Sequence, residues 1–158
     1  MTTKIGIINN GNVGGALERG LKRTSPEVRS VGNDPAAVRA VADSANVVIL
    51  ALGFSTSGAE ELQKKAPKAH VVKAFNTVFA QNMPSGHVGT QAVSALVAGD
   101  DPGAKSTALE RAKTIGFEAV DAGPLRNARL IEPLGYLNIQ LGYMLKMGTD
   151  IGFKVVRA

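Results

Sequence analysis

The sequence predicts an α/β fold with a mostly parallel sheet, helices on both faces of the sheet, and a long C-terminal helix. Three observations predict it. Short β-branched segments alternate with amphipathic segments from end to end, a glycine-rich turn follows the first β-branched segment, and residues 46–52 form a nearly unbroken apolar run. Such a run is typical of a parallel strand that helices cover on both sides. A chain of 158 residues suffices for one hydrophobic core, so we expect residues 1–158 to form a single domain.

Composition excludes several classes of function. The chain has no cysteine, and its two histidines, His70 and His87, are far apart in the sequence, so we expect no disulfide, thiolate nucleophile or metal site. The net charge of +5 is spread along the chain and aromatic residues make up only 4%, so we expect no nucleic-acid partner. No apolar run approaches the roughly 18 residues of a membrane span. With no leader-like segment at the start, the chain is expected to be cytoplasmic and not membrane-bound.

The first elements alternate as strand, helix and strand. Residues 4–8 are β-branched and apolar, which predicts a strand that runs into the glycine-rich turn at 9–15. Apolar residues then recur every four positions between Val13 and Leu21, which predicts a helix with one apolar face. Residues 27–31 predict a second brief strand.

The next helix has a clear start signal. Asp34 followed by Pro35 is typical of an N-cap and a first helical residue. The apolar run at 46–52 then predicts a central strand, and the capping-box spacing from Ser57 predicts a helix to about Ala66. The helix after Asp34 is expected to bury Val38, Val41, Ala42 and Ala45.

The second half continues the alternation. Residues 70–75 and 94–98 predict strands, Asp101 followed by Pro102 predicts the start of a helix that ends at Gly116, and residues 117–120 predict a last strand. Residues 124–147 predict a long helix that packs on the domain or in a dimer. Its apolar face is formed by Leu130, Ile131, Leu134, Leu137, Leu141 and Leu145.

Function in such a fold is expected at the carboxyl ends of the strands. The sequence predicts five such ends: residues 9–14, 32–34, 51–54, 75–77 and 121–124.

The glycine turn suits a dinucleotide pyrophosphate, because glycine lets the backbone approach closely and a helix N-terminus offers free N–H groups. Asn9, Gly11 and Gly14 occupy the aligned positions of the G-x-G-x-x-G pattern, so asparagine replaces the first glycine. Asparagine enters left-handed conformations more readily than most residues do. The alternative is a turn that serves only close packing of strand and helix.

Three motifs in this order resemble the coenzyme F420-dependent NADP oxidoreductase family, including its Steap-type ferric-reductase relatives. They are IGIINNGNVGGAL at 5–17, VVKAFNT at 71–77 and DAGPLRNARLIEPL at 121–134, and the similarity covers most of the chain. The resemblance implies a Rossmann-type domain that holds NADP(H) and passes hydride to or from a deazaflavin (F420) or a flavin.

The resemblance also implies a set of cofactor-binding residues. Asn10, Gly11, Asn12 and Val13 would wrap the pyrophosphate. Ala51 and Leu52 would line the path from adenosine to nicotinamide, and Phe75, Asn76 and Thr77 would lie near the nicotinamide. Ala122, Gly123 and Pro124 would border the acceptor site.

The second strand ends in a departure from the family pattern. The family usually has a Ser-Arg or Thr-Arg pair there for the 2′-phosphate of NADP, whereas this chain has Gly32, Asn33 and Asp34. Asp34 would repel a phosphate and could accept from a free ribose hydroxyl, which favours NAD, or it serves only as the helix N-cap. Arg39, one turn into the helix, is a candidate phosphate contact, so the choice between NADP and NAD stays open.

No catalytic triad, carboxylate pair or metal cluster is apparent, and hydride transfer between nicotinamide and flavin rings requires none. From the resemblance, Asn76 and Thr77 are expected to position the carboxamide; the alternative for residues 75–77 is a strand end with a helix cap. Relatives have a further strand and helix after the equivalent of Leu52. That shortening motivates an alternative function, a nicotinamide-nucleotide-binding regulatory or scaffold module without efficient turnover.

The last helix bears on oligomeric state. In the family such a helix contributes to a homodimer, which the resemblance implies here. Gly135 and Gly142 would provide smooth patches where a second helix could approach, or the helix packs only on its own sheet.

Overall fold

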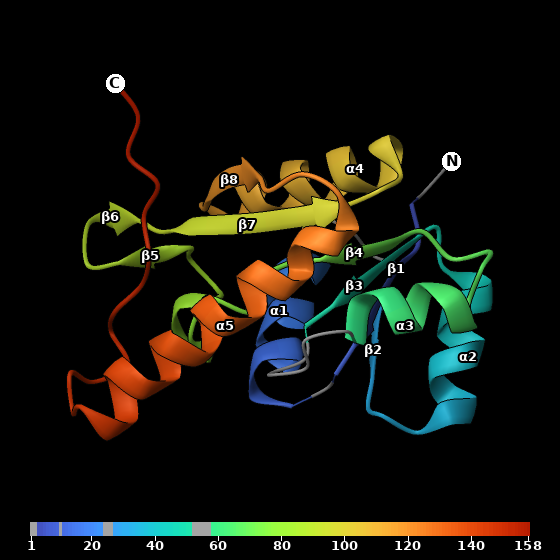
Figure 1. Cartoon of the computed structure of the whole chain (residues 1–158), viewed down its shortest axis with the longest axis horizontal. Helices are drawn as coiled ribbons and strands as arrows, with labels where there is room; N and C mark the ends of the chain where they lie inside the picture. The colour runs from blue at the N-terminus through green and yellow to red at the C-terminus, as the bar shows by residue number, and fades with distance from the viewer. Residues whose placement is uncertain (1–2, 10, 24–26, 52–57) are drawn as a thin grey trace.

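The computed structural model describes residues 3–9, 11–23, 27–51 and 58–158. Within these residues six strands form one sheet in the order β2-β1-β3-β4-β7-β8 (Figure 1). The strands of the sheet are β1 (Ile5–Ile8), β2 (Val28–Val31), β3 (Val47–Leu50), β4 (Val71–Lys73), β7 (Ser94–Gly99) and β8 (Glu118–Asp121). The α-helices are α1 (Asn12–Lys22), α2 (Pro35–Ser44), α3 (Gly58–Lys65), α4 (Pro102–Ile115) and α5 (Ala128–Ile139). The expected fold class, a Rossmann-like α/β fold with a mostly parallel sheet and a long helix near the C-terminus, is confirmed.

The direction of the strands changes in the middle of the sheet. Strands β2, β1, β3 and β4 are mutually parallel, but β7 is antiparallel to β4, with Val72 opposite Gly99. β8 is parallel to β7. The connection from β4 to β7 contains a 3₁₀ turn (Ala80–Asn82) and a small ribbon of β5 (His87–Val88) and β6 (Gln91–Ala92) instead of a crossover helix. The chain therefore enters β7 from the opposite edge.

This reversal corrects one expectation from the sequence. The ends of β1 to β4 share one edge of the sheet, called the carboxyl edge below, whereas residues 121–124 at the end of β8 lie at the opposite edge. The expectation of five strand ends at one edge is wrong for the fifth.

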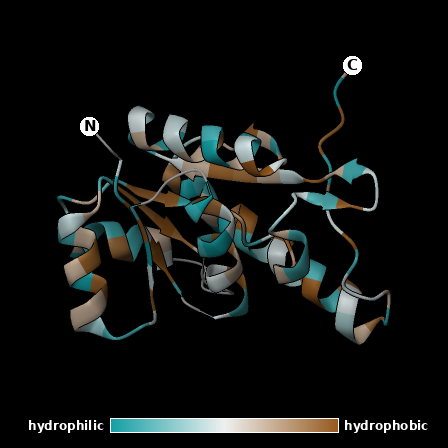
Figure 2. Cartoon of the chain, turned by 180° about the vertical axis from the view of Figure 1, so that it is seen from behind, coloured by the Kyte–Doolittle hydropathy of each residue, from teal (hydrophilic) through white to brown (hydrophobic). Residues whose placement is uncertain are grey.

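Helices cover both faces of the sheet, and alternate strand residues supply two hydrophobic clusters. Ile5 and Ile7 pack in the cluster with α1 and α4, while Ile8 packs in the cluster with α2, α3 and Ala128 at the start of α5. Figure 2 shows the strands as mostly hydrophobic and the covering helices as mixed. β3 lies between β1 and β4 with all four residues buried, as expected for a central strand.

Three predicted helix ends are confirmed, the starts at Asp34 and Asp101 and the end at Gly116. The side chains of Asp34 and Asp101 accept hydrogen bonds from the backbone N–H groups of Ala37 (2.8 Å) and Ala104 (2.7 Å), each with proline at the first helical position. Gly116 ends α4 with a φ of +121°, which glycine adopts without strain. The expected cap at Ser57 lies outside the described residues.

The C-terminal helix departs from its expected packing. A 3₁₀ turn (Leu125–Asn127) leads into α5, and a π-helical segment (Gln140–Met144) follows it. Ile131 is buried, but Leu130, Leu137 and Leu145 are exposed. The buried stripe of α5 consists of Ala128, Ile131, Glu132, Gly135 and Asn138. No helix within the described ranges is long and apolar enough to cross a membrane.

Candidate functional site

The glycine turn is held by the asparagine that replaces the first glycine of the motif. Asn9 has a φ of +98° and its backbone N–H donates to the Val31 carbonyl oxygen at 2.8 Å. Its side-chain Oδ1 accepts from the Gly11 N–H at 2.9 Å, and its Nδ2 donates to the Ala51 carbonyl oxygen at 3.1 Å. One side chain therefore joins the ends of β1 and β3 to the start of α1, which a glycine could not do.

The Asn9 carbonyl oxygen approaches α1 so closely at Gly14 that only a glycine fits there. A Cβ atom there would overlap the Asn9 carbonyl oxygen, so a larger residue forces the turn to shift. The N-cap of α1 is Gly11, no side chain caps the helix, and its first turn contains no acidic residue. The N-terminus of α1 thus presents backbone N–H groups and a positive dipole end without a competing carboxylate. Asn10, expected in the same turn, lies outside the described residues.

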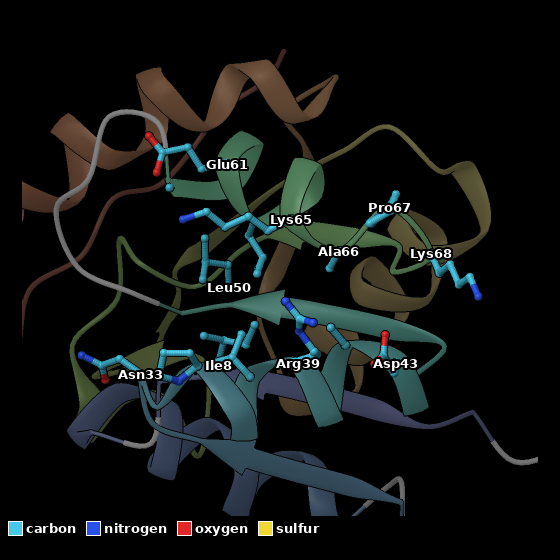
Figure 3. Close-up of a pocket in the computed structure, with 15 residues that line it drawn as sticks. Ile8, Asn33, Arg39, Asp43, Leu50, Glu61, Lys65, Ala66, Pro67 and Lys68 are labelled. Atoms are coloured by element: carbon cyan, nitrogen blue, oxygen red, sulfur yellow. The ribbon is translucent and has the colours of Figure 1, made fainter.

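The end of β2 opens into a pocket of about 770 Å³ between α2 and α3 (Figure 3). Ile8, Asn33 and Leu50, at the ends of β1, β2 and β3, line one part of it. Arg39 on α2 also lines the pocket, whereas the Asp34 carboxylate accepts from the backbone of α2 as its N-cap. The structure thus brings Asn33 and Arg39 to the same cavity. Leu52, expected beside them, lies outside the described residues.

The end of β4 places its residues in three different environments. Phe75 has a φ of +66° and is fully buried, with its ring edge-on to that of Phe117 at a centroid distance of 5.6 Å. Asn76 donates from Nδ2 to the Ile131 carbonyl oxygen at 3.1 Å. Within the described ranges, the buried Asn76 Oδ1 and Thr77 Oγ1 atoms have no hydrogen-bond partner. None of the three residues caps a described helix.

α5 and the π-helical segment that follows it pack against the segment that follows β4. A Cβ atom at Gly135 would lie 2.5 Å from the Asn76 carbonyl oxygen, and one at Gly142 would lie 2.7 Å from Cζ of Phe79. Asn138 donates from Nδ2 to the Thr77 carbonyl oxygen at 3.1 Å. The two glycines therefore face the chain's own loop, which corrects the expectation that they form a surface for a second helix.

A buried ion pair connects the same two segments and was missed by the sequence reasoning. Lys73 Nζ lies 3.2 Å from Glu132 Oε1, with both side chains almost fully buried. Burial lowers the pKa of the Lys73 ammonium, because desolvation outweighs the attraction of Glu132. The signal was available: each charge interrupts an apolar stretch, VVKAF in one case and LIEPL in the other.

Residues 122–124 are positioned by contacts at the opposite edge. Gly123 has a φ of +87°, its N–H donates to the Asp121 carboxylate at 2.8 Å, and its carbonyl oxygen accepts from the Gly99 N–H at 3.1 Å. The structure therefore gathers Asn9, residues 11–14, Asn33, Ala51 and residues 75–77 at the carboxyl edge and leaves residues 122–124 apart from them.

Comparisons with known proteins agree with the fold. No protein-family model matches the chain. Metalloreductase STEAP3 from Rattus norvegicus is 39% identical over 79 residues, which span 49% of this chain and 16% of that protein's length. The chain therefore corresponds to a small part of this curated relative.

Solved structures extend the similarity to nearly the whole chain. A protein from Arthrobacter sp. FB24, provisionally assigned as an F420-dependent NADP reductase, aligns with a TM-score of 0.72 and 19% identity over 98% of this chain and 100% of its own. A reductive aminase from Aspergillus terreus in complex with NADPH and ethyl levulinate aligns with a TM-score of 0.62 and 14% identity over 92% of this chain and 63% of its own. The resemblance stated from the three motifs is thus confirmed as a similarity to these proteins.

Proposed function

We propose that the chain binds NADP(H) along the carboxyl edge and transfers hydride between NADP(H) and a deazaflavin (F420) or flavin acceptor. The observation that carries the proposal is the turn from Asn9 to Gly14. The Asn9 carbonyl oxygen lies against Gly14 of α1 at a distance that only glycine permits, at an uncapped helix N-terminus and beside the ends of β2 and β3. A pyrophosphate is the ligand class that such a turn suits.

The remaining residues of the edge fit the rest of the dinucleotide. The first turn of α1 would hold the pyrophosphate, and Asn33 and the apolar residues of the α2–α3 pocket would hold the adenosine. Asn76 Oδ1 is a buried acceptor without a partner in the described structure. An N–H of the nicotinamide carboxamide would satisfy it, and binding would then move the α5 contact that covers it. The bound cofactors would supply the hydride chemistry, while the protein would orient the rings and exclude water.

The similarities support the same class of activity. The Arthrobacter protein carries F420 and NADP in its assignment, the Aspergillus enzyme was solved with NADPH, and STEAP3 is a metalloreductase. Residues 122–124 do not enter the proposed acceptor site, because they lie at the other edge of the sheet.

The test is a direct titration. NADPH and NADH are titrated separately, and oxidation of each is then followed with F420 and with FMN. We expect binding and nucleotide oxidation with at least one acceptor. Binding without oxidation would favour a regulatory or scaffold module, and no binding of either nucleotide would contradict the proposal.

Asn76 provides a sharper test of the nicotinamide position. We expect Asn76→Ala to slow hydride transfer at saturating nucleotide. The matched control is Asn127→Ala, because Asn127 donates to the Ala122 carbonyl oxygen at 2.7 Å at the opposite edge. Equal rates in the two variants would remove the role assigned to Asn76.

We further propose that the chain forms a homodimer through the outer face of α5 and of the residues that follow it up to position 147. Eight of the ten exposed large hydrophobic residues in the described structure fall between positions 130 and 147, among them Leu130, Leu137 and Met144 at seven-residue spacing. A concentrated apolar surface of this kind is typical of an interface between copies. Sedimentation at micromolar concentration tests it, and a monomer would contradict it.

A further inference from the structure

The pocket between α2 and α3 has an apolar floor and charged walls. Ile8, Val38, Leu50 and Leu62 supply apolar lining, and Asn33 places the end of β2 at the same cavity. An adenine ring suits such a floor, and its ribose would then lie near Asn33. If the ribose carries a phosphate, residues that line this cavity would have to bind it.

Two cations reach this cavity from opposite sides. In Figure 3 the Arg39 guanidinium rises from α2 toward the cavity, and the Lys65 side chain extends from α3 over Leu50. In the part of the chain that the structure describes, neither side chain forms an ion pair. Lys68 also lines the pocket, but its side chain points away from the other two (Figure 3).

Carboxylates near the pocket do not neutralise this pair. Asp43 and Glu61 also line the pocket, each one helical turn from Arg39 and Lys65 respectively, but in the described ranges no ion pair joins either carboxylate to these cations. The Glu61 carboxylate points away from the floor (Figure 3). Asp34 accepts from the Ala37 N–H at 2.8 Å, so its carboxylate is engaged by the helix. The loop after β2, residues 32–34, contains no cation of its own.

We propose that Arg39 and Lys65 together bind the 2′-phosphate of NADP(H), one from each wall of the pocket, and so make the chain selective for NADP(H) over NAD(H). The inference rests on the proposed function and names the specificity residues of that same site. Arginine offers a planar set of donors to phosphate oxygens, and lysine adds a mobile point charge. The cations thus come from two helices instead of the loop after β2.

The experiment measures NADPH and NADH affinities by calorimetry for the full chain and for Arg39→Gln, Lys65→Gln and Lys68→Gln. The fragments 2′,5′-ADP and 5′-AMP serve as further probes, since they differ in the phosphate alone. We expect Arg39→Gln and Lys65→Gln each to weaken NADPH and 2′,5′-ADP about tenfold, with NADH and 5′-AMP changed less than about twofold. Lys68→Gln should leave all four affinities unchanged.

The outcomes separate this inference from the proposal on which it rests. Tight binding of both nucleotides with an NADPH-to-NADH ratio that Arg39→Gln and Lys65→Gln do not change overturns the inference and leaves the proposed function standing. A wild type that binds NADH more tightly also overturns it. Binding of neither nucleotide overturns both. The three residues are exposed, so each variant is expected to fold, and thermal unfolding verifies this.

Discussion

Up to β3 the carboxyl edge is built around the turn that Asn9 and Gly14 shape, whereas from the end of β4 onward it is built from buried polar side chains. Asn9 and Gly14 shape the first part through a turn of a few residues. In the described structure the buried polar and charged residues are Lys73, Thr77, Asn82, Ser94, Glu132 and Asn138, and all follow β3. Their contacts join positions far apart in the chain, such as Asn76 to Ile131. The first part therefore depends on one turn, whose Asn9 also bonds to Val31 and Ala51, and the second depends on several distant side-chain pairs that must be made together.

The largest expected effect is in the second part. Lys73→Met leaves the Glu132 carboxylate buried without its cation, and we expect the free energy of unfolding to fall by about 3–5 kcal/mol. Denaturant unfolding measures it. The double variant Lys73→Met/Glu132→Leu should recover most of the loss, because it removes both charges. A double variant no better than the single one would show that the pair does not couple these segments.

A somewhat smaller loss is expected in the first part. Gly14→Ala brings a Cβ atom into the Asn9 carbonyl oxygen, and we expect a loss of about 3 kcal/mol together with loss of nucleotide binding. The control is Gly103→Ala in the first turn of α4, where a Cβ atom would meet only Asp101 Oδ1 at 3.4 Å. That variant should unfold no earlier than the wild type. Unimpaired nucleotide binding by Gly14→Ala would contradict the role of the turn.

The next effect is a dependence on pH that belongs to the second part alone. The Lys73 pKa is lowered in the folded state from its ordinary value of 10.5. Between the folded pKa and 10.5 the unfolded chain holds more protons, so this group makes the free energy of unfolding rise with pH and the rise ends above 10.5. The free energy of unfolding of the wild type minus that of Lys73→Met/Glu132→Leu, measured in urea from neutral pH upward, should therefore become more positive. If this quantity falls as the pH rises, the lowered pKa of Lys73 in the folded state is contradicted.

Helix caps should behave alike in both parts. Asp34→Ala and Asp101→Ala each remove one side-chain acceptor at a helix N-terminus, and we expect each to cost about 1 kcal/mol in thermal unfolding. Equal losses of stability would show that the two parts differ only at the carboxyl edge and not in their helix caps. A much larger loss for one variant would show that its helix end also supports the carboxyl edge.

The smallest expected effect on stability is on the outer face of α5. Leu137 is 47% exposed, so Leu137→Glu should change the free energy of unfolding by less than about 0.5 kcal/mol. The same variant should abolish the proposed dimer in sedimentation experiments. A dimer that persists would place the interface elsewhere.

The sequence predicts features that depend on neighbouring residues better than features that depend on residues far apart in the chain. The six strands of the main sheet, the Asp34 and Asp101 caps and the glycine turn were predicted correctly, because each depends on residues close together in the chain, whereas the β5–β6 ribbon was not predicted. The direction of β7 was not, because it depends on how residues 76–93 connect two strands. The inner face of α5 was assigned correctly for Ile131 but not for Leu130 and Leu137. Glu132 and Asn138 are polar residues that a periodicity argument places in solvent, whereas Lys73 and Thr77 hold them inside.

Because β7 and β8 run in the opposite direction to β1–β4, α5 has to cross from one edge of the sheet to the other, and its length sets the distance between its two contacts. The helix starts at the edge where β8 ends, with Ala128 in the core, and reaches the carboxyl edge where Asn138 meets Thr77. Each residue of an α-helix adds about 1.5 Å of length and about 100° of rotation. The number of residues between these two anchors therefore fixes how far and at which angle the loop after β4 is held. Adding or deleting one residue in α5 disturbs that loop more than changing the identity of an exposed one.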